Sequence, residues 1–461
     1  MREVGLAGVC GGRAMRLSLA WFVACMVSAP AWAAPVRDIP GWNGSIPVDL
    51  SRSPAVNAWQ PAIAAGAGED LIVAWSDPRT VGEPHNIYTT LSSDGGRTWS
   101  GPQVVTDTAA NSRLPDALIV GGRTVVAWSD ETSERTFTLC DAQRDTPVSA
   151  WSTHCVPGPT SYASTRPRLA YGQGWVYMVY SAGSEQSPDI VYASRRLTDT
   201  AWSMPETVYT HTALYGSHFP ALGVGADGQT VHVAWEERTS ATVGAIMYLS
   251  GTLDAGSVSW RYPAEELSVG TARVVWPSVA VDADGNVHVV WARRGDPRQY
   301  DVFHRRLDAV HGTWSTPKTI GVSVGVNAAI PNDVAPRIVA SQDEDGVRVC
   351  VAWHGYQTGQ AGQAAEEVLL SCSRDGGGSW SPPVTVSRTP GGEEISMMPD
   401  VAVDAAGQLH LAWQERAGPS PVYDYQIYYA RSMEPTYIPF CARNSVSLPL
   451  WAVLPRTLRT E

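Results

Sequence analysis

The segment Pro277-Ser-Val-Ala-Val-Asp-Ala-Asp-Gly-Asn-Val-His-Val-Val-Trp291 contains the pattern that decides the fold. Apolar residues alternate on both sides of a Gly-containing turn, which is typical of two β-strands joined in a hairpin. Six other segments repeat this order of a Pro, an alternating stretch, a turn and a second stretch that ends in Trp or Tyr. The seven copies are Pro61–Trp75, Pro115–Trp128, Pro167–Tyr180, Pro220–Trp235, Pro277–Trp291, Pro336–Trp353 and Pro399–Trp413. The chain is therefore an array of one repeated unit.

Each unit has room for four strands, because successive repeat prolines are 52 to 63 residues apart. In the unit quoted above, these strands are expected at 277–281, 287–291, 301–305 and 317–322. A sheet of four short strands buries both faces only by stacking on neighbours around an axis. The sequence predicts an all-β fold, a seven-bladed β-propeller of four-stranded blades.

The two ends of the array predict how the ring closes. The last unit has strands through 426–430 and then departs from the pattern, whereas residues 46–51 precede Pro61 as other fourth strands precede their prolines. An N-terminal strand that completes the C-terminal blade would remove two exposed sheet edges. We expect the propeller to span 34–432 and a C-terminal tail to span 433–461.

The first 33 residues have the pattern of an export signal. Arg13 and Arg16 precede the apolar run 17–27, and small residues follow at 31–33. Cleavage there predicts a secreted or extracytoplasmic protein. No later segment reaches the ~18 apolar residues of a membrane-spanning helix, so no membrane span is expected. With 33 Lys and Arg against 45 Asp and Glu, the formal charge of −12 argues against nucleic acid as a partner.

Cysteine and histidine spacing predicts disulfides and no metal site. Cys140 with Cys155, and Cys350 with Cys372, flank predicted hairpins, and export would permit both bridges. No Cys-x-x-Cys motif is present. One histidine stands three residues before the repeat Trp in each of three separate units, where packing is the better interpretation: His232, His288 and His410. We expect no metal and no cofactor.

Two of the predicted hairpins between third and fourth strands share the motif Ser-x-Asp-x-Gly-x-x-Trp. In each, Asp accepts backbone N–H groups, Gly supplies positive φ, and Trp packs the hairpin onto its sheet. The residues are Ser92, Asp94, Gly96 and Trp99, and Ser373, Asp375, Gly377 and Trp380. The motif resembles the Asp box, or bacterial neuraminidase repeat, of the sialidase superfamily. The resemblance implies a stabilising role for these residues, and a seven-bladed array departs from the six blades of familiar sialidase domains.

The resemblance also implies a site for a possible exo-sialidase. Such an enzyme holds a sugar carboxylate with arginines and uses a Tyr nucleophile with an Asp as acid/base. Ser112-Arg113-Leu114-Pro115 is similar to the family's Arg-Ile-Pro element. The candidates for these roles are Arg113, Arg168 and Arg337 for the carboxylate, Asp77 and Asp130 for the proton donor, and Tyr423, with Tyr425 or Tyr215 as alternatives, for the nucleophile. No family motif surrounds the acids or the tyrosines.

A second interpretation needs no substrate. Arg168 and Arg337 each follow the repeat Pro, and the equivalent residue of an adjacent unit is Asp116 or Asp400, so ion pairs between blades explain both arginines. Recurring acids two residues after the repeat Trp, such as Asp77 and Asp130, similarly favour local pairing over catalysis.

We therefore expect a glycan-binding protein on a sialidase-like scaffold, with a glycan or glycoconjugate as its partner. Its candidate stacking platforms are Trp59, Tyr215 and Trp276, in the links that lead to inner strands. The alternatives are an exo-sialidase or related glycosidase that hydrolyses terminal sialic acid, and a protein-binding scaffold.

Overall fold

The alternating segments form antiparallel strands that pair in seven separate sheets. The computed structural model describes residues 42, 44–53, 56–131, 136–158, 166–184, 186–211, 215–268, 272–294, 299–324, 334–343, 346–355, 366–387, 395–417 and 424–432. The expected signal segment and C-terminal tail lie outside these residues.

Each sheet is one blade, and its strands are ordered from the channel outward. The strands are, in blade 1, β2 (Trp59–Ala65), β3 (Leu71–Asp77), β4 (Asn86–Ser92) and β5 (Gln103–Val104); in blade 2, β6 (Asn111–Val120), β7 (Arg123–Glu131), β8 (Phe137–Arg144) and β9 (Ser152–Cys155); in blade 3, β10 (Arg168–Gly172), β11 (Trp175–Gly183), β12 (Pro188–Arg196) and β13 (Glu206–Tyr209); in blade 4, β14 (Ser217–Val224), β15 (Thr230–Arg238), β16 (Gly244–Asp254), β17 (Ser257–Trp260) and β18 (Glu265–Glu266); in blade 5, β19 (Val274–Val281), β20 (Val287–Arg294), β21 (Gln299–Asp308), β22 (Thr313–Trp314) and β23 (Lys318–Val324); in blade 6, β24 (Arg337–Asp343), β25 (Gly346–Gly355), β26 (Glu367–Ser373) and β27 (Val384–Thr385); and in blade 7, β28 (Ser396–Val403), β29 (Leu409–Ala417), β30 (Asp424–Arg431) and β1 (Val48–Asp49).

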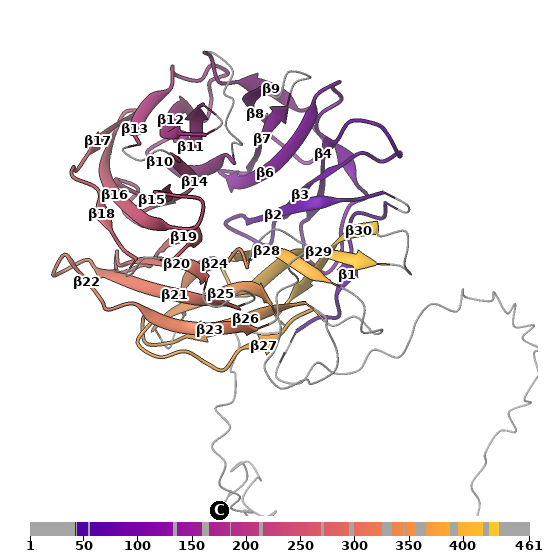
Figure 1. Ribbon diagram of the computed structural model, residues 1–461. Coiled ribbons are helices and arrows are strands. Elements are labelled where there is room, and N and C mark those ends of the chain that lie inside the picture. Colours follow the sequence, from indigo (N-terminus) through magenta and orange to yellow (C-terminus); the bar gives the residue numbers. More distant parts are fainter. Residues whose placement is uncertain are drawn as a thin grey trace, which may run out of the picture. The chain divides into compact units, whose positions relative to one another are not determined.

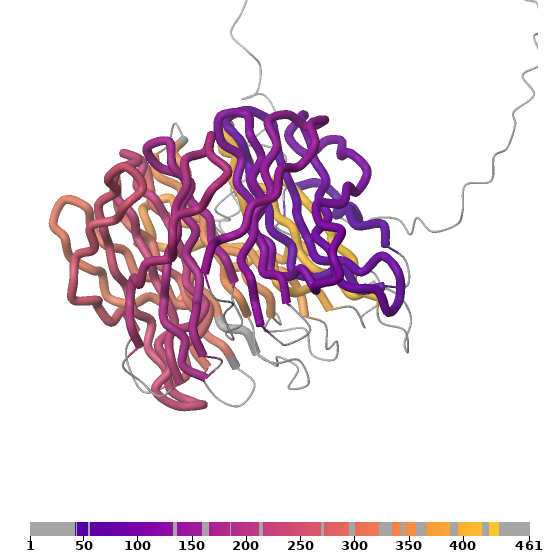
Figure 2. The backbone as a smooth tube through the Cα atoms, turned by 90° about the horizontal axis from the view of Figure 1, so that it is seen from above, coloured from indigo at the N-terminus to yellow at the C-terminus, as the bar shows by residue number. Residues whose placement is uncertain are grey.

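The blades follow one another around a ring in chain order (Figure 1). In blades 4 and 5 the outer strand consists of two pieces that pair with the same third strand. Figure 2 shows the last blade, in yellow, beside the first, in indigo. The prediction of a seven-bladed propeller of four-stranded blades is confirmed.

Packing between blades is built around the residue that ends each second repeat stretch. Six of these residues are tryptophans that are at most 1% exposed, and blade 3 has Tyr180 instead. Trp75 packs in a cluster with residues of blade 7, and Trp353 packs in a cluster with residues of blade 5. One such cluster bridges each neighbouring pair of blades. Large apolar residues at one repeat position therefore form the contacts between blades.

An N-terminal segment lies along β30 of the last blade. Val48 pairs with Tyr429 and Asp49 with Tyr428. The N–H of Leu50 donates to the Ile427 carbonyl at 2.8 Å. These contacts give blade 7 its fourth strand.

The two Ser-x-Asp-x-Gly-x-x-Trp hairpins have closely similar hydrogen bonds. In blade 1, Ser92 Oγ donates to Asp94 Oδ1 at 2.7 Å and accepts the Gly96 N–H at 2.9 Å. In blade 6, Ser373 Oγ makes the corresponding bonds to Asp375 and Gly377 at 2.7 and 2.8 Å.

The glycines of these hairpins lie against the neighbouring blade. Gly96 has φ +76°, and a Cβ there would lie 1.8 Å from the Tyr429 hydroxyl. Gly377 has φ +86°, and a Cβ there would lie 2.2 Å from the His304 ring. Both the left-handed conformation and the close approach therefore require glycine.

Two disulfides each join neighbouring strands of one blade. Cys140 of β8 is bonded to Cys155 of β9, and Cys350 of β25 is bonded to Cys372 of β26. In both pairs the two cysteines are direct partners in the strand register.

Candidate functional site

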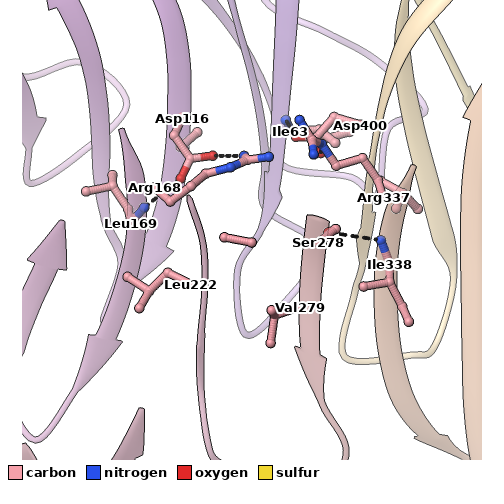
Figure 3. A pocket seen from close by; sticks show the side chains of 13 residues that line it. Ile63, Asp116, Arg168, Leu169, Leu222, Ser278, Val279, Arg337, Ile338 and Asp400 are labelled. Carbon is pink, nitrogen blue, oxygen red and sulfur yellow. Dashed lines mark hydrogen bonds and ion pairs between the residues drawn. The ribbon is translucent and has the colours of Figure 1, made fainter. Parts of the chain in front are cut away.

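The inner strands surround a central cavity of about 170 Å³. Its polar lining comes from the residue that follows the repeat Pro in five of the seven blades (Figure 3). The residues at this repeat position that line the cavity are Asp116, Arg168, Ala221, Ser278, Arg337 and Asp400. The next residue of each inner strand adds an apolar wall of Ile63, Ala117, Leu169, Leu222, Val279, Ile338 and Val401.

Two ion pairs cross from blade to blade in this cavity. Arg168 Nη1 lies 2.8 Å from Asp116 Oδ1, and Arg337 Nε lies 3.2 Å from Asp400 Oδ1. The second contact is an ion pair without hydrogen-bond alignment, because Arg337 Nε has no hydrogen-bond partner among the described residues. Figure 3 shows both guanidinium groups pointing toward the same space. The ion pairs between blades that the second interpretation predicts are therefore present.

The same carboxylates also tie the inner strands together. Asp116 Oδ2 accepts the N–H of Leu169 in the next blade at 2.7 Å, and Asp400 Oδ2 accepts the N–H of Ile63 at 3.0 Å. Ser278 Oγ accepts the Ile338 N–H in the equivalent place at 3.4 Å. A short acceptor directly after the repeat Pro thus serves as a link between blades.

A third arginine, Arg166, belongs to this cluster and was not among the residues predicted from the sequence. Its side chain comes from the residue before the repeat Pro of blade 3 and is 5% exposed. Its Nε and Nη1 have no hydrogen-bond partner in the described part of the chain. Burial, together with the positive charges of Arg337 and Arg168, holds the pKa of the Arg166 guanidinium well below its usual value. Burial and the charge of Arg168 also lower the pKa of Arg337 to about 9.

The signal that identifies Arg166 is its place in the repeat. The residue before the repeat Pro is uncharged in the other six blades: Gln60, Leu114, Phe219, Trp276, Ala335 and Met398. All six have positive φ, between 27° and 59°. In five blades the strand register shifts at this point, which is the signature of a β-bulge. Arg166 is thus the one charged residue at this repeat position, and the sequence alone shows that difference.

Side chains from these bulges meet one another at one end of the channel. Phe219 stacks on Trp276 with ring centroids 4.2 Å apart, and Arg166 Cζ lies 5.1 Å from the Trp276 ring. Trp276 is only 7% exposed. Trp276 is therefore part of this packing and is not the open stacking platform that the sequence suggested.

Arg113 and Trp59 lie together in a different place, at the junction of blades 1 and 2. Trp59 stacks on His85 with ring centroids 4.9 Å apart, and Arg113 Nη1 lies 3.4 Å from Glu131 Oε2. Burial and the charge of Arg113 lower the pKa of His85 to about 4, so the imidazole is neutral at neutral pH. We call Trp59, His85, Arg113 and Glu131 the blade 1–2 patch. All four residues are partly exposed.

The three arginines predicted to hold one carboxylate therefore lie in two different places. Arg168 and Arg337 line the cavity, whereas Arg113 is not among the residues that line it. Each of the three also lies beside a carboxylate.

Asp77 and Asp130 bind the repeat tryptophans of their own blades. Trp75 Nε1 donates to Asp77 at 3.2 Å, and Trp128 Nε1 donates to Asp130 at 2.8 Å. A serine hydroxyl also donates to each carboxylate, at 3.0 and 2.6 Å. Burial raises the pKa of Asp130 against these hydrogen bonds. Neither residue lines the central cavity.

Tyr215 and the three predicted packing histidines do not join either cluster. Tyr215 is 42% exposed near blade 4, and Tyr423 lies outside the described residues. His232, His288 and His410 bond to partners in their own blades. The described ranges contain no group of three His, Cys, Asp or Glu residues suited to a metal ion. In those same ranges, no helix is long and apolar enough to cross a membrane.

Comparison with solved structures finds other proteins of similar fold. A protein of unknown function from Dyadobacter fermentans DSM 18053 matches with a TM-score of 0.50 and 15% identity, over 85% of this chain and 99% of that chain. The phage phi92 endosialidase matches with a TM-score of 0.48 and 12% identity, over 88% and 71% of the two chains. The alpha-L-arabinanase of Penicillium chrysogenum matches with a TM-score of 0.47 and 14% identity, over 68% and 94%. At these identities the likeness concerns the fold alone, and neither a family model nor a curated protein sequence matches the chain.

Proposed function

We propose that this propeller binds a glycan on the blade 1–2 patch. The observation that carries the proposal is a partly exposed Trp59 ring, stacked on His85 and placed beside the Arg113–Glu131 pair. An aromatic face packs against the apolar face of a sugar ring, and neighbouring polar groups fix the orientation of its hydroxyls.

The polar edge of the patch retains capacity for hydrogen bonds. Arg113 keeps a side-chain exposure of 36%, so part of this side chain faces solvent. Glu131, with 20% side-chain exposure, offers acceptors next to these donors. A donor and an acceptor side by side match the paired hydroxyl groups of a saccharide.

Two further features fit a role outside the cytoplasm. The Cys140–Cys155 and Cys350–Cys372 bridges are typical of oxidising compartments. The apolar run 17–27 has the pattern of an export signal. We propose that the protein is exported and meets its glycan there.

The experiment is a glycan array with the purified protein, followed by calorimetric titration of the best ligand. We expect Trp59→Ala and Arg113→Ala each to weaken binding about tenfold or more, equivalent to about 1.4 kcal/mol. The matched control is Tyr215→Ala, which removes an exposed aromatic residue near blade 4. Equal losses in all three variants, or an array without ligands, would contradict the proposal.

The same variants test the two alternatives. Release of a fluorophore from an aryl sialoside, lost in Arg113→Ala, would identify an exo-sialidase. A secreted protein partner, with no response to sugars, would identify a protein-binding scaffold.

A further inference from the structure

The central channel holds more positive than negative charge. Arg168, Arg337, Asp116 and Asp400 line it, and the buried Arg166 lies close enough for all four charges to act on its guanidinium group. Guanidinium groups keep their protons in proteins. One positive charge is therefore in excess in this set.

The two carboxylates are already engaged. Asp116 uses one oxygen for Arg168 and the other for the Leu169 N–H. Asp400 uses one oxygen for Arg337 and the other for the Ile63 N–H. Arg166 is thus the cation for which the described residues provide no acceptor at Nε or Nη1.

A buried cation without a counter-charge is strongly unfavourable, because burial removes its hydration. Phe219 and Arg238 provide an internal comparison. Arg238 lies 5.4 Å from the Phe219 ring, much as Arg166 lies over Trp276, but its Nε is 2.7 Å from Glu236 Oε1. Of these two stacked arginines, only Arg238 has a carboxylate partner in the described structure.

We propose that the channel binds one small monovalent anion, of halide size, near Arg166, Arg168 and Arg337. The space of about 170 Å³ has room for such an ion, and the charged groups that line it come from Arg168, Arg337, Asp116 and Asp400. A halide accepts hydrogen bonds from several directions, which suits guanidinium groups that arrive from blades 3 and 6. This site lies apart from the blade 1–2 patch and is independent of the glycan proposal.

The first experiment measures thermal unfolding at constant ionic strength while sodium chloride replaces sodium gluconate, whose bulky anion is not of halide size. Binding to the folded state alone raises the midpoint with ligand concentration. We expect a rise of about 1–2 °C for each tenfold increase in chloride above its dissociation constant. An unchanged wild-type midpoint would overturn the proposal.

Three variants locate the effect. Arg166→Met removes the excess charge and should abolish the chloride response. Arg238→Met removes the comparison arginine, and its midpoint should fall while the response to chloride remains. A chloride response that persists in Arg166→Met would overturn the proposal.

The third variant, Ser278→Asp, keeps all three arginines and adds the missing carboxylate. Asp already occupies this repeat position in blades 2 and 7, and Ser278 already accepts the Ile338 N–H. We expect Ser278→Asp to fold and to lose the chloride response, even if Arg166→Met does not fold. A full response in Ser278→Asp would count against the site.

Bromide provides a direct readout in crystals of the wild-type protein. We expect an anomalous peak in the channel within hydrogen-bonding distance of these guanidinium groups. A peak without any halide effect in solution would mean binding at crystal concentration only, and it would overturn the proposal.

Discussion

The aspartates at the outer rim of this propeller accept hydrogen bonds within one hairpin, whereas those at its centre accept hydrogen bonds from neighbouring blades. At the rim, Asp94 receives its hydrogen bonds from residues 92 to 98. At the centre, Asp116 and Asp400 receive theirs from other blades, with Ile63 lying 337 residues from Asp400 in the chain. The rim carboxylate stabilises one turn, whereas the central carboxylates link one blade to the next.

The two environments also act on the carboxylates in opposite directions. Burial is the largest single effect on Asp94 and opposes its ionisation, but the hydrogen bonds from Thr98, Ser92 and Arg97 together outweigh it and lower its pKa to about 2. At Asp116 burial dominates and raises the pKa, even though Arg168 and the Leu169 N–H favour the charged form. Asp116 therefore depends on its partners to stay ionised, while the hairpin around Asp94 favours the ionised carboxylate.

Removal of β1 tests both regions at once, because both cross the seam between blades 7 and 1. Trp99 of the blade 1 hairpin packs on Tyr429 at 4.7 Å, and Asp400 of blade 7 bonds Ile63 of blade 1. We expect a chain without residues 44–53 to lose cooperative unfolding or to melt about 10 °C lower or more. Differential scanning calorimetry measures this effect.

The control for that deletion is Ser51→Ala, which removes only the hydroxyl that donates to Gln426 Oε1 at 2.7 Å. The loss there should be about 1 kcal/mol. An unchanged midpoint in the deletion variant would show that the N-terminal strand does not hold the ring closed.

A smaller but still large effect is expected at the centre. Asp116→Ala leaves Arg168 buried without its carboxylate and the Leu169 N–H without its acceptor. We expect a loss of about 3–5 kcal/mol in the free energy of unfolding, measured by chemical denaturation. Ser278→Ala, at the equivalent position of blade 5, removes a neutral acceptor only and should cost about 1 kcal/mol. Equal losses would mean that charge adds nothing to this link.

The contrast between rim and centre explains what the sequence could predict. Strand alternation, the repeat Trp and the Asp94 hairpin are local patterns, so the number of blades follows from them. Pairing of Arg168 with Asp116 was also accessible, because the two residues occupy one repeat position in adjacent units.

The cluster around Arg166 was harder to predict because its members approach across the ring. The spacing of residues in the sequence does not predict that Arg166 of blade 3 contacts Trp276 of blade 5. Arg113 stands two residues before its repeat Pro, whereas Arg168 and Arg337 directly follow theirs. The strand register shifts between Arg113 and Asp116, and Arg113 lies beside Glu131 rather than in the cavity.

The smallest effect is expected at the rim, where Asp94→Ala removes hydrogen bonds that are screened by solvent. A loss of about 1 kcal/mol is expected at neutral pH. Because the folded-state pKa of Asp94 is lowered to about 2, this stability is present above the unfolded-state value near ~4 and is lost as the pH falls toward 2. Unfolding midpoints of wild type and variant should therefore converge between pH 4 and pH 2.

Asp375→Ala, in the matching hairpin of blade 6, should show the same pH dependence, because hydrogen bonds from Ser379 and Ser373 outweigh burial and lower the pKa of Asp375 too. A difference between wild type and Asp94→Ala that persists unchanged at pH 2 would mean that the hairpin is stabilised by packing of Trp99 on Tyr429, and not by the charged carboxylate.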